Sequence, residues 1–372
     1  MTDLYIGLMS GTSMDGIDAA LVDFSSKDPR VVATHNEPWP GAVHRQLVTA
    51  LALPDPRNAN LAELDTAVGE YFARATNRLL DNAGIDPAGV QAIGSHGQTI
   101  RHEPDAEQPY SLQIGNPDVI TANTGIDVVA DFRSADIQAG GQGAPLVPAF
   151  HKASFSTANE NRVVVNIGGI ANITVLPCDP AVAVTGFDTG PGNTLMDAWA
   201  QQQLKTAMDA GGNWAAGGTC DKQLLEMLLA DAYFSSAPPK STGREYFNRD
   251  WLSGFLPADN TTAQDIQATL CRLTTRSIVD AIEQYAPATA RLLVCGGGIH
   301  NDCLMQQLRS ELAETPVEST ADYGIDPDWV EAAAFAWLAK QNIEARPGNL
   351  PEVTGANRSV ILGKLFKAGN SA

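Results

Sequence analysis

The sequence predicts an α/β protein made of two related lobes, and three observations support this. Predicted strands alternate with predicted helices along the chain, which is the pattern of layered α/β architectures. Residues 4–24 contain two β-type runs joined by a glycine-rich turn, and residues 162–176 repeat that arrangement. The chain has 372 residues, which is more than one ordinary hydrophobic core requires. No low-complexity linker separates the halves, so we expect abutting lobes that leave a cleft.

The other elements follow from the spacing of apolar residues. Val68, Phe72 and Leu79 recur at helical spacing, and Gly84 ends that predicted helix. Short apolar runs bounded by polar loops predict strands. In chain order we expect a helix over 59–84, strands over 90–100 and 125–132, a strand before Asn193 and a helix from it, a helix over 262–285, a strand over 290–295, a helix capped by Asn301 and a helix over 327–343.

The repeated hairpin also sets the expected lobe boundaries. The first lobe is expected to cover residues 1–158 and the second lobe residues 159–349. We expect the C-terminal segment 350–372 to return to the first lobe.

The composition excludes several classes of protein. The formal net charge is −19, which disfavours nucleic acid and anionic membranes as partners because both require basic patches. No apolar run reaches the roughly 18 residues of a membrane span, and the N-terminus lacks the features of a signal peptide. The five cysteines and six histidines show neither CxxC nor HExxH spacing, so we expect reduced thiols and no structural zinc. These features are typical of a cytoplasmic protein.

The first glycine turn, GTSMDG at residues 11–16, suits phosphate binding. It is not a P-loop, because no lysine follows it, and not a Rossmann turn, because it leads into a strand. Glycines let successive N–H groups approach an anion, and the hydroxyls of Thr12 and Ser13 add donors. Asp15 and Asp18 would repel phosphate but could hold Mg²⁺ through its waters. A plain hairpin turn is the alternative for one copy alone; two copies, one in each lobe, favour phosphate binding.

Two further glycine turns complete this hypothesis. The second turn, at Gly168 and Gly169, precedes Ala171 and Asn172 where the first copy has acids, so we expect it to supply backbone N–H groups. The third turn, Gly296–Gly298, lies between a predicted strand and a predicted helix. Glycines there permit close approach of adenine, or only tight packing. Together the three turns indicate a nucleotide site between the two lobes.

Asp188, in GFDTGPGN, is the candidate general base. It ends a predicted strand beside Phe187 and precedes a turn containing two glycines and a proline. A carboxylate placed in this way can accept a proton from an attacking oxygen, as an aspartate does in many kinases. An Asx turn or a helix cap is the alternative.

Polar loops supply candidate groups for a polyhydroxylated ligand that carries a carboxylate. One group is His96, Gln98, Thr99 and Arg101, although a single histidine is more often structural. Arginines in glycine-rich loops could bind the carboxylate, and surface salt bridges are the alternative. The candidates of this kind are Arg133, with Asp136 nearby, and Arg244, with Lys240 nearby. For Lys240 a position on the surface is favoured.

Eight motifs, taken together, resemble one known family. In chain order they are MSGTSMDGID, SHGQT, DFRSADIQAGGQGAPLVPAFH, NIGGIANIT, GFDTGPGNTLMDAW, KSTGREYF, VCGGGIHN and EAAAFAWLA. The ordered set spans nearly the whole chain and resembles the anhydro-N-acetylmuramic acid kinases. That family belongs to the superfamily of actin, hexokinase and heat-shock chaperone ATPases. The resemblance therefore implies an actin-like ATPase fold with ribonuclease H-like lobes and a nucleotide cleft between them.

The resemblance also implies an activity and a set of site residues. ATP and Mg²⁺ would act with 1,6-anhydro-N-acetylmuramic acid to give N-acetylmuramic acid 6-phosphate and ADP, in peptidoglycan recycling, and the protein would be a homodimer. Asp188 would be the catalytic base, Glu331 would lie near it and the metal, and Asp15 would be a metal ligand. The residues expected to bind the nucleotide are Gly11, Thr12, Ser13, Met14, Asp15, Gly16, Ile17, Asp18, Asn166, Gly168, Gly169, Asn172, Gly296, Gly297, Gly298 and Asn301. The residues expected to bind the sugar are His96, Gln98, Thr99, Arg133 and Asn193.

Two other functions remain as alternatives. A conventional sugar kinase of the same superfamily would phosphorylate an existing hydroxyl, such as that of N-acetylmuramic acid itself. A non-catalytic, ATP-driven binding protein would need a separate client-binding region, for which the sequence offers no segment. A sugar-responsive DNA-binding regulator is disfavoured because we find no basic patch or helix-turn-helix pattern.

Overall fold

The computed structural model describes residues 3–11, 14, 16–256 and 261–369, so the predictions for Thr12, Ser13 and Asp15 lie outside the described residues. The chain divides into two compact units. Unit 1 comprises Met1–Ser154 and Gly324–Ala372, and unit 2 comprises Phe155–Tyr323. Within the described ranges, no helix is both long enough and apolar enough to cross a membrane.

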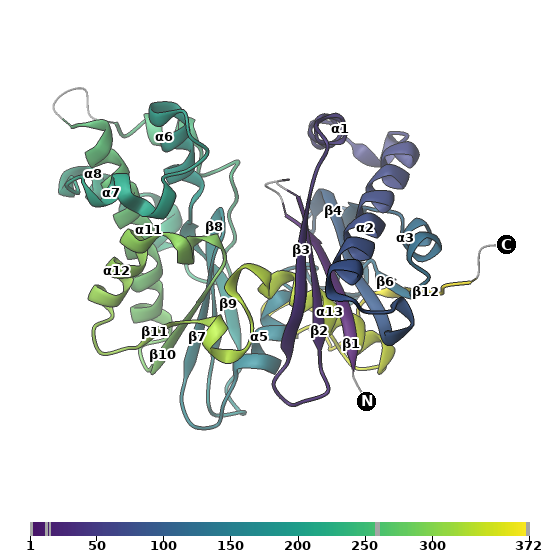
Figure 1. Cartoon of the computed structure of the whole chain (residues 1–372). Coiled ribbons are helices and arrows are strands. Elements are labelled where there is room, and N and C mark those ends of the chain that lie inside the picture. The colour runs from purple at the N-terminus through teal and green to yellow at the C-terminus, as the bar shows by residue number, and fades with distance from the viewer. Residues whose placement is uncertain (1–2, 12–13, 15, 257–260, 370–372) are drawn as a thin grey trace. The chain divides into compact units, whose positions relative to one another are not determined.

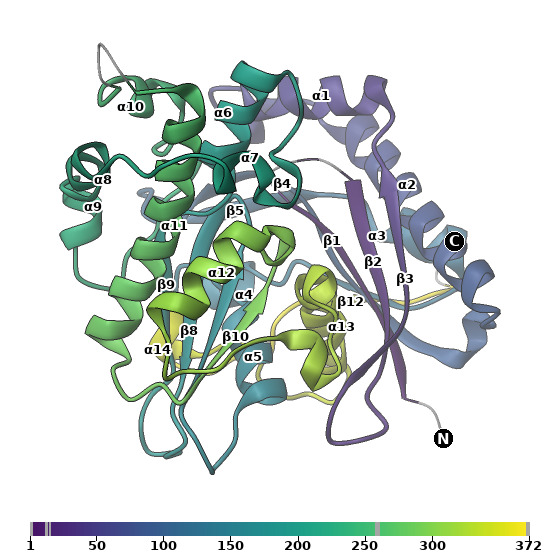
Figure 2. The same ribbon diagram turned by 60° about the vertical axis from the view of Figure 1, so that its left-hand side comes forward.

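Unit 1 contains one mixed sheet. Its first three strands form an antiparallel meander, visible side by side in Figure 1 and again in Figure 2. Two further strands run parallel to the first strand on its other side, and the last strand of the chain pairs antiparallel at the edge. The order across the sheet is β12 (Lys364–Phe366), β6 (Val128–Ala130), β4 (Val90–Glu103), β1 (Leu4–Ser10), β2 (Gly16–Asp23) and β3 (Arg30–Pro38), and β5 (Tyr110–Ile114) pairs with β4.

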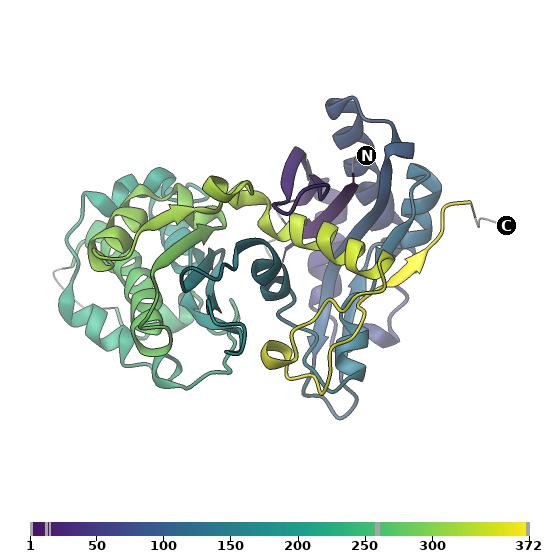
Figure 3. The same ribbon diagram turned by 90° about the horizontal axis from the view of Figure 1, so that it is seen from below.

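Helices pack on both faces of this sheet because successive residues of a strand point to opposite sides. Ile6 of β1 shares a hydrophobic core with Phe72 of α2 (Ala62–Ala83). Gly7, the next residue, faces α13 (Val330–Ile343), which packs against β1, β2 and β4 and is the yellow-green helix of Figure 3. The other helices of this unit are α1 (Gly41–Leu51), α3 (Pro117–Thr124), α4 (Ser134–Gln138), α5 (Val147–Phe155, which ends at the unit boundary), α14 (Pro351–Thr354) and the 3₁₀ turns η1 (Pro56–Asn58), η2 (Pro87–Gly89) and η6 (Pro327–Trp329).

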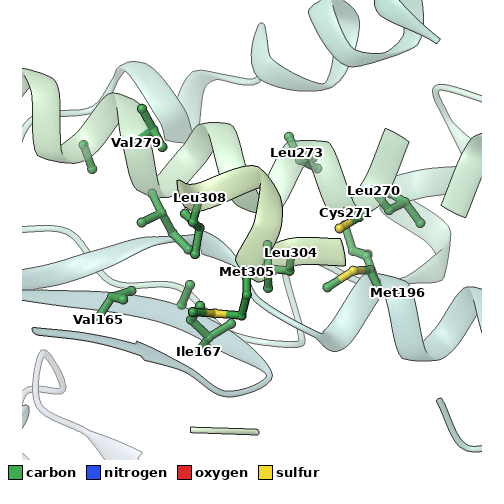
Figure 4. Packing of buried hydrophobic residues seen from close by; sticks show 14 of the residues in the cluster. Val165, Ile167, Met196, Leu270, Cys271, Leu273, Val279, Leu304, Met305 and Leu308 are labelled. Carbon is green, nitrogen blue, oxygen red and sulfur yellow. The ribbon is translucent and has the colours of Figure 1, made fainter. Parts of the chain in front are cut away.

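Unit 2 contains a second mixed sheet, in the order β11 (Val317–Ser319), β10 (Arg291–Cys295), β7 (Arg162–Ile167), β8 (Ile170–Leu176) and β9 (Thr185–Pro191). Its core joins the apolar face of β7 to α11 (Ala263–Tyr285) and α12 (Asp302–Glu311), and Figure 4 shows Ile167, Met305 and Leu308 in this packing. The remaining helices are α6 (Thr194–Leu204), α7 (Asn213–Ala216), α8 (Lys222–Leu229), α9 (Ala232–Ser235), α10 (Arg249–Ser253) and the 3₁₀ turns η3 (Ala210–Gly212), η4 (Gly297–His300) and η5 (Thr320–Tyr323).

The two sheets share one topology. In each, the first three strands are antiparallel neighbours, and the next two strands of the core order run parallel to the first: β3-β2-β1-β4-β6 in unit 1 and β9-β8-β7-β10-β11 in unit 2. This is the ribonuclease H-like order. The prediction of an α/β protein with two related lobes is therefore confirmed.

The units differ from the expected lobes at their borders. The change of unit falls at Ser154, close to the expected border, but the chain returns to unit 1 at Gly324 rather than at residue 350. The reason is α13, which packs against β1, β2 and β4. A helix–sheet contact between the two ends of the chain leaves no local signal in the sequence.

Candidate functional site

The residues on both sides of the first glycine turn are held by buried polar contacts in unit 1. Oγ of Ser10 lies 2.7 Å from Oε1 of Gln98 and 2.9 Å from the carbonyl oxygen of Gly16. Nε2 of Gln98 donates to the carbonyl oxygen of Gly11 at 3.4 Å. Gln98 is fully buried, so its amide holds the backbone beside the turn. The sequence predicted Gln98 as a sugar ligand, which stays a prediction; in the structure its amide contacts the backbone beside the turn.

Three other residues of this motif take different positions. Met14 has a left-handed backbone (φ 55°), and its N–H donates to the carbonyl oxygen of Gly11. Ile17 is fully buried and fills the core. Asp18 of β2 lies opposite Met9 of β1 and Asn36 of β3 in the strand register. Nδ2 of Asn36 donates to Oδ1 of Asp18 at 2.7 Å, a partner that nothing in the sequence indicated.

A second polar cluster in unit 1 combines His96, Arg133 and Glu331. Nη2 of Arg133 lies 2.8 Å from Nε2 of His96, and Nη1 donates to the carbonyl oxygen of Gly143 at 2.7 Å. Burial and the charge of Arg133 lower the pKa of His96 to about 3. His96 is therefore neutral, and its Nε2 accepts the hydrogen bond from Arg133. Nε of Arg133 is buried and has no hydrogen-bond partner among the described residues, so this cation retains an unused donor.

Glu331, in the first turn of α13, is partly buried and does not lie on an exposed helix face. Burial raises the pKa of Glu331, the negative charge of Asp18 raises it further, and Arg133 opposes both effects. Burial also lowers the pKa of Arg133 to about 10, while Glu331 counteracts this shift. The carboxylates of Asp18 and Glu331 thus interact electrostatically within unit 1.

Thr99 and Arg101 lie further along β4. Nε2 of Gln113 donates to Oγ1 of Thr99 at 3.1 Å, and the guanidinium of Arg101 donates to the carbonyl oxygen of Leu53. Thr99 keeps a hydroxyl proton to donate, whereas Arg101 holds a loop of its own unit.

The second glycine turn is fixed from one side by the start of α6. The N–H groups of Gly192 and Thr194 donate to the carbonyl oxygen of Gly169, and that of Asn193 donates to the carbonyl oxygen of Gly168. Nδ2 of Asn193 also donates to the carbonyl oxygens of Ile167 and Gly168. Asn193 was predicted as a sugar ligand, which stays a prediction, and its Nδ2 contacts hold the second turn.

Three polar residues form a row across the sheet of unit 2. Asn166 of β7 pairs with Asn172 of β8, and Asn172 pairs with Asp188 of β9. Paired residues of antiparallel strands point to the same face. The two predicted nucleotide ligands and the predicted base therefore lie on one side of this sheet.

Asp188 itself is held by the segment that follows α9. The N–H of Thr242 donates to Oδ2 of Asp188 at 2.9 Å, and the hydroxyl of Tyr233 donates to its carbonyl oxygen at 2.7 Å. Burial raises the pKa of Asp188 from 3.8 to about 6. The negative charge of Glu245 also raises this pKa, whereas the hydrogen bond from the Thr242 N–H lowers it. A carboxylate with this pKa is ionised at neutral pH and is basic enough to accept a proton. The sequence pointed to the KSTGREYF motif, but gave no reason to single out Thr242 or Tyr233.

The third glycine turn combines packing with one open position. A Cβ on Gly296 would lie 2.9 Å from the carbonyl oxygen of Ile167 and overlap the side-chain oxygen of Asn166, and a Cβ on Gly298 would overlap the side chain of Ile167. No heavy atom would lie within 4 Å of a Cβ on Gly297. Asn301 caps α12, accepting from the N–H of Leu304 at 3.0 Å. Gly296, Gly298 and Asn301 thus shape this turn, and Gly297 is the glycine with open space beside it.

Comparison with known proteins identifies the family. The model of the anhydro-N-acetylmuramic acid kinase family matches residues 3–368. An anhydro-N-acetylmuramic acid kinase of Shewanella halifaxensis is 52% identical over 366 residues, covering 98% of both chains. One of Coxiella burnetii is 49% identical over 363 residues, covering 97% of both chains. The chain belongs to the anhydro-N-acetylmuramic acid kinase family.

Solved structures outside this family are more distant. The activator of 2-hydroxyisocaproyl-CoA dehydratase from Clostridium difficile with bound ADPNP has a TM-score of 0.47 and 11% identity, covering 92% of this chain and 96% of that chain. A ROK family glucokinase from Streptomyces griseus in complex with glucose and AMPPNP has a TM-score of 0.38 and 13% identity, covering 90% of this chain and 99% of that chain. The family assignment rests on the full-length relatives.

The acids of unit 1 can be compared with the ligands that the expected Mg²⁺ would need. The described residues contain no group of three or more histidine, cysteine, aspartate or glutamate side chains that could hold a metal ion. Mg²⁺ commonly takes only one or two carboxylates and keeps several waters. Asp18 and Glu331, whose negative charges interact unfavourably, fit that requirement because a divalent cation would relieve the repulsion.

Proposed function

We propose that this protein is an ATP-dependent kinase that hydrolytically opens 1,6-anhydro-N-acetylmuramic acid and phosphorylates its 6-oxygen. The products are N-acetylmuramic acid 6-phosphate and ADP, and the reaction serves peptidoglycan recycling. The family match over residues 3–368 supports the substrate. The observation that carries the chemistry is Asp188, a partly buried carboxylate whose pKa is raised to about 6.

Asp188 acts first, as a general base. Its carboxylate accepts a proton from a water molecule while the water oxygen attacks the anomeric carbon, and the bond from that carbon to the bridging oxygen breaks. The bridging oxygen becomes the 6-oxygen of the sugar and takes the γ-phosphoryl group of ATP, leaving ADP. The Thr242 N–H donates to Oδ2 of Asp188 and orients the carboxylate, whose remaining lone pairs can accept the proton. Such transfer depends on positioning and charge stabilisation rather than on a covalent intermediate.

The nucleotide is bound by the three glycine turns. Gly11–Asp18 in unit 1, Gly168 and Gly169 in unit 2 and the open position at Gly297 supply backbone groups to ATP. Asp18 and Glu331 would hold Mg²⁺, with Asp15 as a further ligand. When bound, Mg²⁺ supplies positive charge that offsets the charge of the phosphates.

The sugar carboxylate is bound by Arg133. Its Nε is buried and unpaired among the described residues, and His96 orients its guanidinium through Nη2. Thr99 offers a hydroxyl to the sugar. Gln98 and Asn193 act indirectly, by supporting the first and the second glycine turn. The family resemblance further supports a cytoplasmic homodimer, which light scattering and cell fractionation would test.

The deciding experiment is turnover of the anhydro sugar in ¹⁸O-labelled water. The protein, MgATP and 1,6-anhydro-N-acetylmuramic acid should give a 6-phosphorylated product that carries the label at the anomeric hydroxyl. The variant Asp188→Asn should lose this activity, whereas Asp81→Asn, an exposed position on α2, should keep it. Phosphorylation of N-acetylmuramic acid without turnover of the anhydro sugar would instead indicate a conventional sugar kinase. No phosphorylation of either sugar would reject both.

A further inference from the structure

Two cysteine side chains meet in unit 2 where α11 packs on α12. Cys271 lies on α11, and Cys303 is the second residue of α12. Nε2 of Gln307 donates to both sulfurs, at 3.7 Å to Sγ of Cys271 and at 3.4 Å to Sγ of Cys303. The thiol of Cys271 also donates a hydrogen bond to the sulfur of Cys303. Two free thiols from different helices are therefore held next to each other.

The amide of Gln307 is fixed in the orientation that this contact requires. Oγ1 of Thr275, on α11, donates to Oε1 of Gln307 at 3.0 Å. With the oxygen end of the amide engaged in this way, the nitrogen end faces the two sulfurs. A thiol sulfur is a weak acceptor, whereas a charged acceptor binds an N–H group more strongly. The amide therefore favours the thiolate form of a cysteine at this position.

The two thiols differ in exposure and in their surroundings. Cys271 is fully buried in the core drawn in Figure 4, whereas Cys303 is only partly buried. Cys303 also lies in the first turn of α12, where the helix dipole favours negative charge. A reagent from solvent can therefore reach Cys303 but not Cys271.

The ionisation of the pair follows the same division. The hydrogen bond from Cys271 lowers the pKa of Cys303 from 9.0 to about 7. Gln307 acts in the same direction, whereas burial and the negative charge of Asp209 oppose the shift. The hydrogen bond to Cys303, together with burial, raises the pKa of Cys271. Cys303 is thus the thiol that ionises near neutral pH, and Cys271 keeps its proton.

Cys220 shows that partial burial alone does not produce such a thiol. It is partly buried, as Cys303 is. Burial raises its pKa, although a hydrogen bond with Thr269 lowers it. Cys220 therefore stays protonated at neutral pH and provides a comparison within the same unit.

We propose that Cys303 and Cys271 form an oxidation site that reacts with small peroxides and closes a disulfide between α11 and α12. A partly exposed thiolate beside a second, buried thiol is the arrangement that reversible cysteine oxidation requires. The bond would fix the first turn of α12 to α11. That turn is capped by Asn301, which follows the third glycine turn. The inference concerns a modification of the protein and does not depend on its sugar substrate.

The reaction has two steps. First, the thiolate sulfur of Cys303 attacks one oxygen of hydrogen peroxide, the O–O bond breaks, and hydroxide leaves, so Cys303 becomes a sulfenic acid. Second, the sulfur of Cys271 loses its proton and attacks the sulfur of Cys303, the S–O bond breaks, and the hydroxyl leaves with a proton as water. The two thiols are oxidised, the peroxide is reduced, and two water molecules are formed in total.

The test is oxidation of the full-length protein by hydrogen peroxide, followed by acid quenching, alkylation and peptide mapping by mass spectrometry without reductant. The wild type should lose two of its five free thiols and yield one cross-linked pair of peptides, which contain Cys271 and Cys303. A dithiol reductant should restore both thiols. Before cross-linking, Cys303 should react about 10-fold or more faster than Cys220 at pH 7, because a larger fraction of it is thiolate.

Variants separate the two steps. Cys271→Ser keeps a hydroxyl donor beside Cys303 but cannot close the disulfide, so it should stop at a sulfenic acid on Cys303, which a cyclic diketone would label. Cys303→Ser should leave the buried Cys271 reduced. Cys220→Ser is the matched control and should form the disulfide at the rate of the wild type. The peptide map of the wild type tests the proposal even where a variant folds poorly.

Three outcomes would overturn the proposal. A wild-type protein whose Cys271 and Cys303 both stay reduced while Cys220 is oxidised would show that the pair is not reactive. Oxidation of Cys303 beyond the sulfenic acid with no cross-link would show that Cys271 cannot reach it. A cross-link that forms only when the protein is unfolded would show that the native packing of α11 on α12 does not bring the sulfurs together.

Discussion

Asn172 of β8 and Asp188 of β9 lie directly opposite each other in the antiparallel register of unit 2. In unit 1 the corresponding second and third strands carry the same two residue types in reverse, because Asp18 of β2 lies opposite Asn36 of β3. Each unit thus has one acid beside one amide, but on exchanged strands. The repeated sheet thus places one carboxylate in each unit, and under the proposed function Asp18 would serve the metal and Asp188 would serve as the base.

The pH dependence of the reaction should follow the ionisation of the Asp188 carboxyl group. A general base must be ionised, and burial raises the pKa of Asp188 to about 6. We therefore expect kcat/KM to increase with pH through about 6 and then to reach a plateau. Asp188→Asn should lower kcat by about 100-fold or more, the usual contribution of a general base. A profile already flat at pH 5 would show that another group accepts the proton.

The stability of the wild-type protein should fall as the pH rises, whereas its activity increases, and Asp188→Asn should remove this loss of stability. The folded carboxyl holds its proton up to a pH of about 6, whereas in the unfolded chain it loses the proton near 3.8. The wild type therefore loses stability as the pH rises from about 4 to 6. The asparagine side chain of the variant carries no charge at any pH, so the variant should melt at a higher temperature than the wild type above pH 6, and this difference should shrink toward pH 4. Melting curves by calorimetry at pH 4.5 and 7.5 measure both values, and a difference that does not change with pH would contradict this account.

His96 should make the protein sensitive to acid. Its folded-state pKa is lowered to about 3 from 6.5, so the unfolded chain binds a proton that the folded protein excludes. The stability contributed by neutral His96 is thus present above pH 6.5 and decreases as the pH falls toward 3. In His96→Gln, whose side-chain oxygen can accept from Arg133, the melting temperature should fall less between pH 7 and 5 than in the wild type. Parallel curves for the two proteins would show that His96 is not the group that resists protonation.

The contact between α13 and the sheet should tolerate no Cβ at two glycines. A Cβ on Gly7 would overlap the carbonyl oxygen of Ala332, and a Cβ on Gly94 would overlap that of Phe335. Either substitution by alanine should cost more than about 4 kcal/mol, because backbone must move. Gly89→Ala is the matched control, since a Cβ there meets no heavy atom within 4 Å. Chemical denaturation should show a large loss for the first two variants and little change for the third.

Asp136 should be important for stability rather than for binding. It is fully buried, and it accepts hydrogen bonds from Nδ2 of Asn349 at 2.6 Å, Oγ1 of Thr354 at 2.7 Å and the N–H of Gly143 at 2.8 Å. Asp136→Ala would leave three buried donors without a partner, at a cost of about 2–4 kcal/mol. The variant should unfold at lower denaturant concentration while its affinity for ADP, measured well below that concentration, stays that of the wild type. Weaker ADP binding by the folded variant would contradict this role.

The sequence predicted the helices and the strands of the hairpins well, because their signals are local. Gly84 adopts the left-handed conformation that ends α2, and Asn301 caps α12 as expected. The return of the chain at Gly324 could not be predicted in the same way, because packing of α13 on β1 joins residues far apart in sequence.

In the candidate site, too, local features could be predicted from the sequence, whereas features that depend on distant segments could not. The position of Asp188 at the end of a strand was readable from GFDTGPGN, but its raised pKa depends on burial and on Thr242, which lies on a separate segment. Polar residues in glycine-rich motifs looked alike in the sequence. The structure separates Arg133, whose Nε has no partner within the described ranges, from Gln98, whose amide is engaged by the backbone beside the first turn.

The split of unit 1 across the two ends of the chain has a consequence for biosynthesis. The strands β1 and β4 leave the ribosome early, whereas α13, which covers their glycine-bearing face, follows only after the whole of unit 2. Unit 2 is continuous, so it can become a finished folding domain as soon as Tyr323 has emerged. Until α13 has also emerged, the nascent N-terminal sheet exposes an uncovered face, at the stage when partly folded chains aggregate or recruit chaperones. Translation that stops before residue 330 would release a protein with one complete domain and one that cannot close its core.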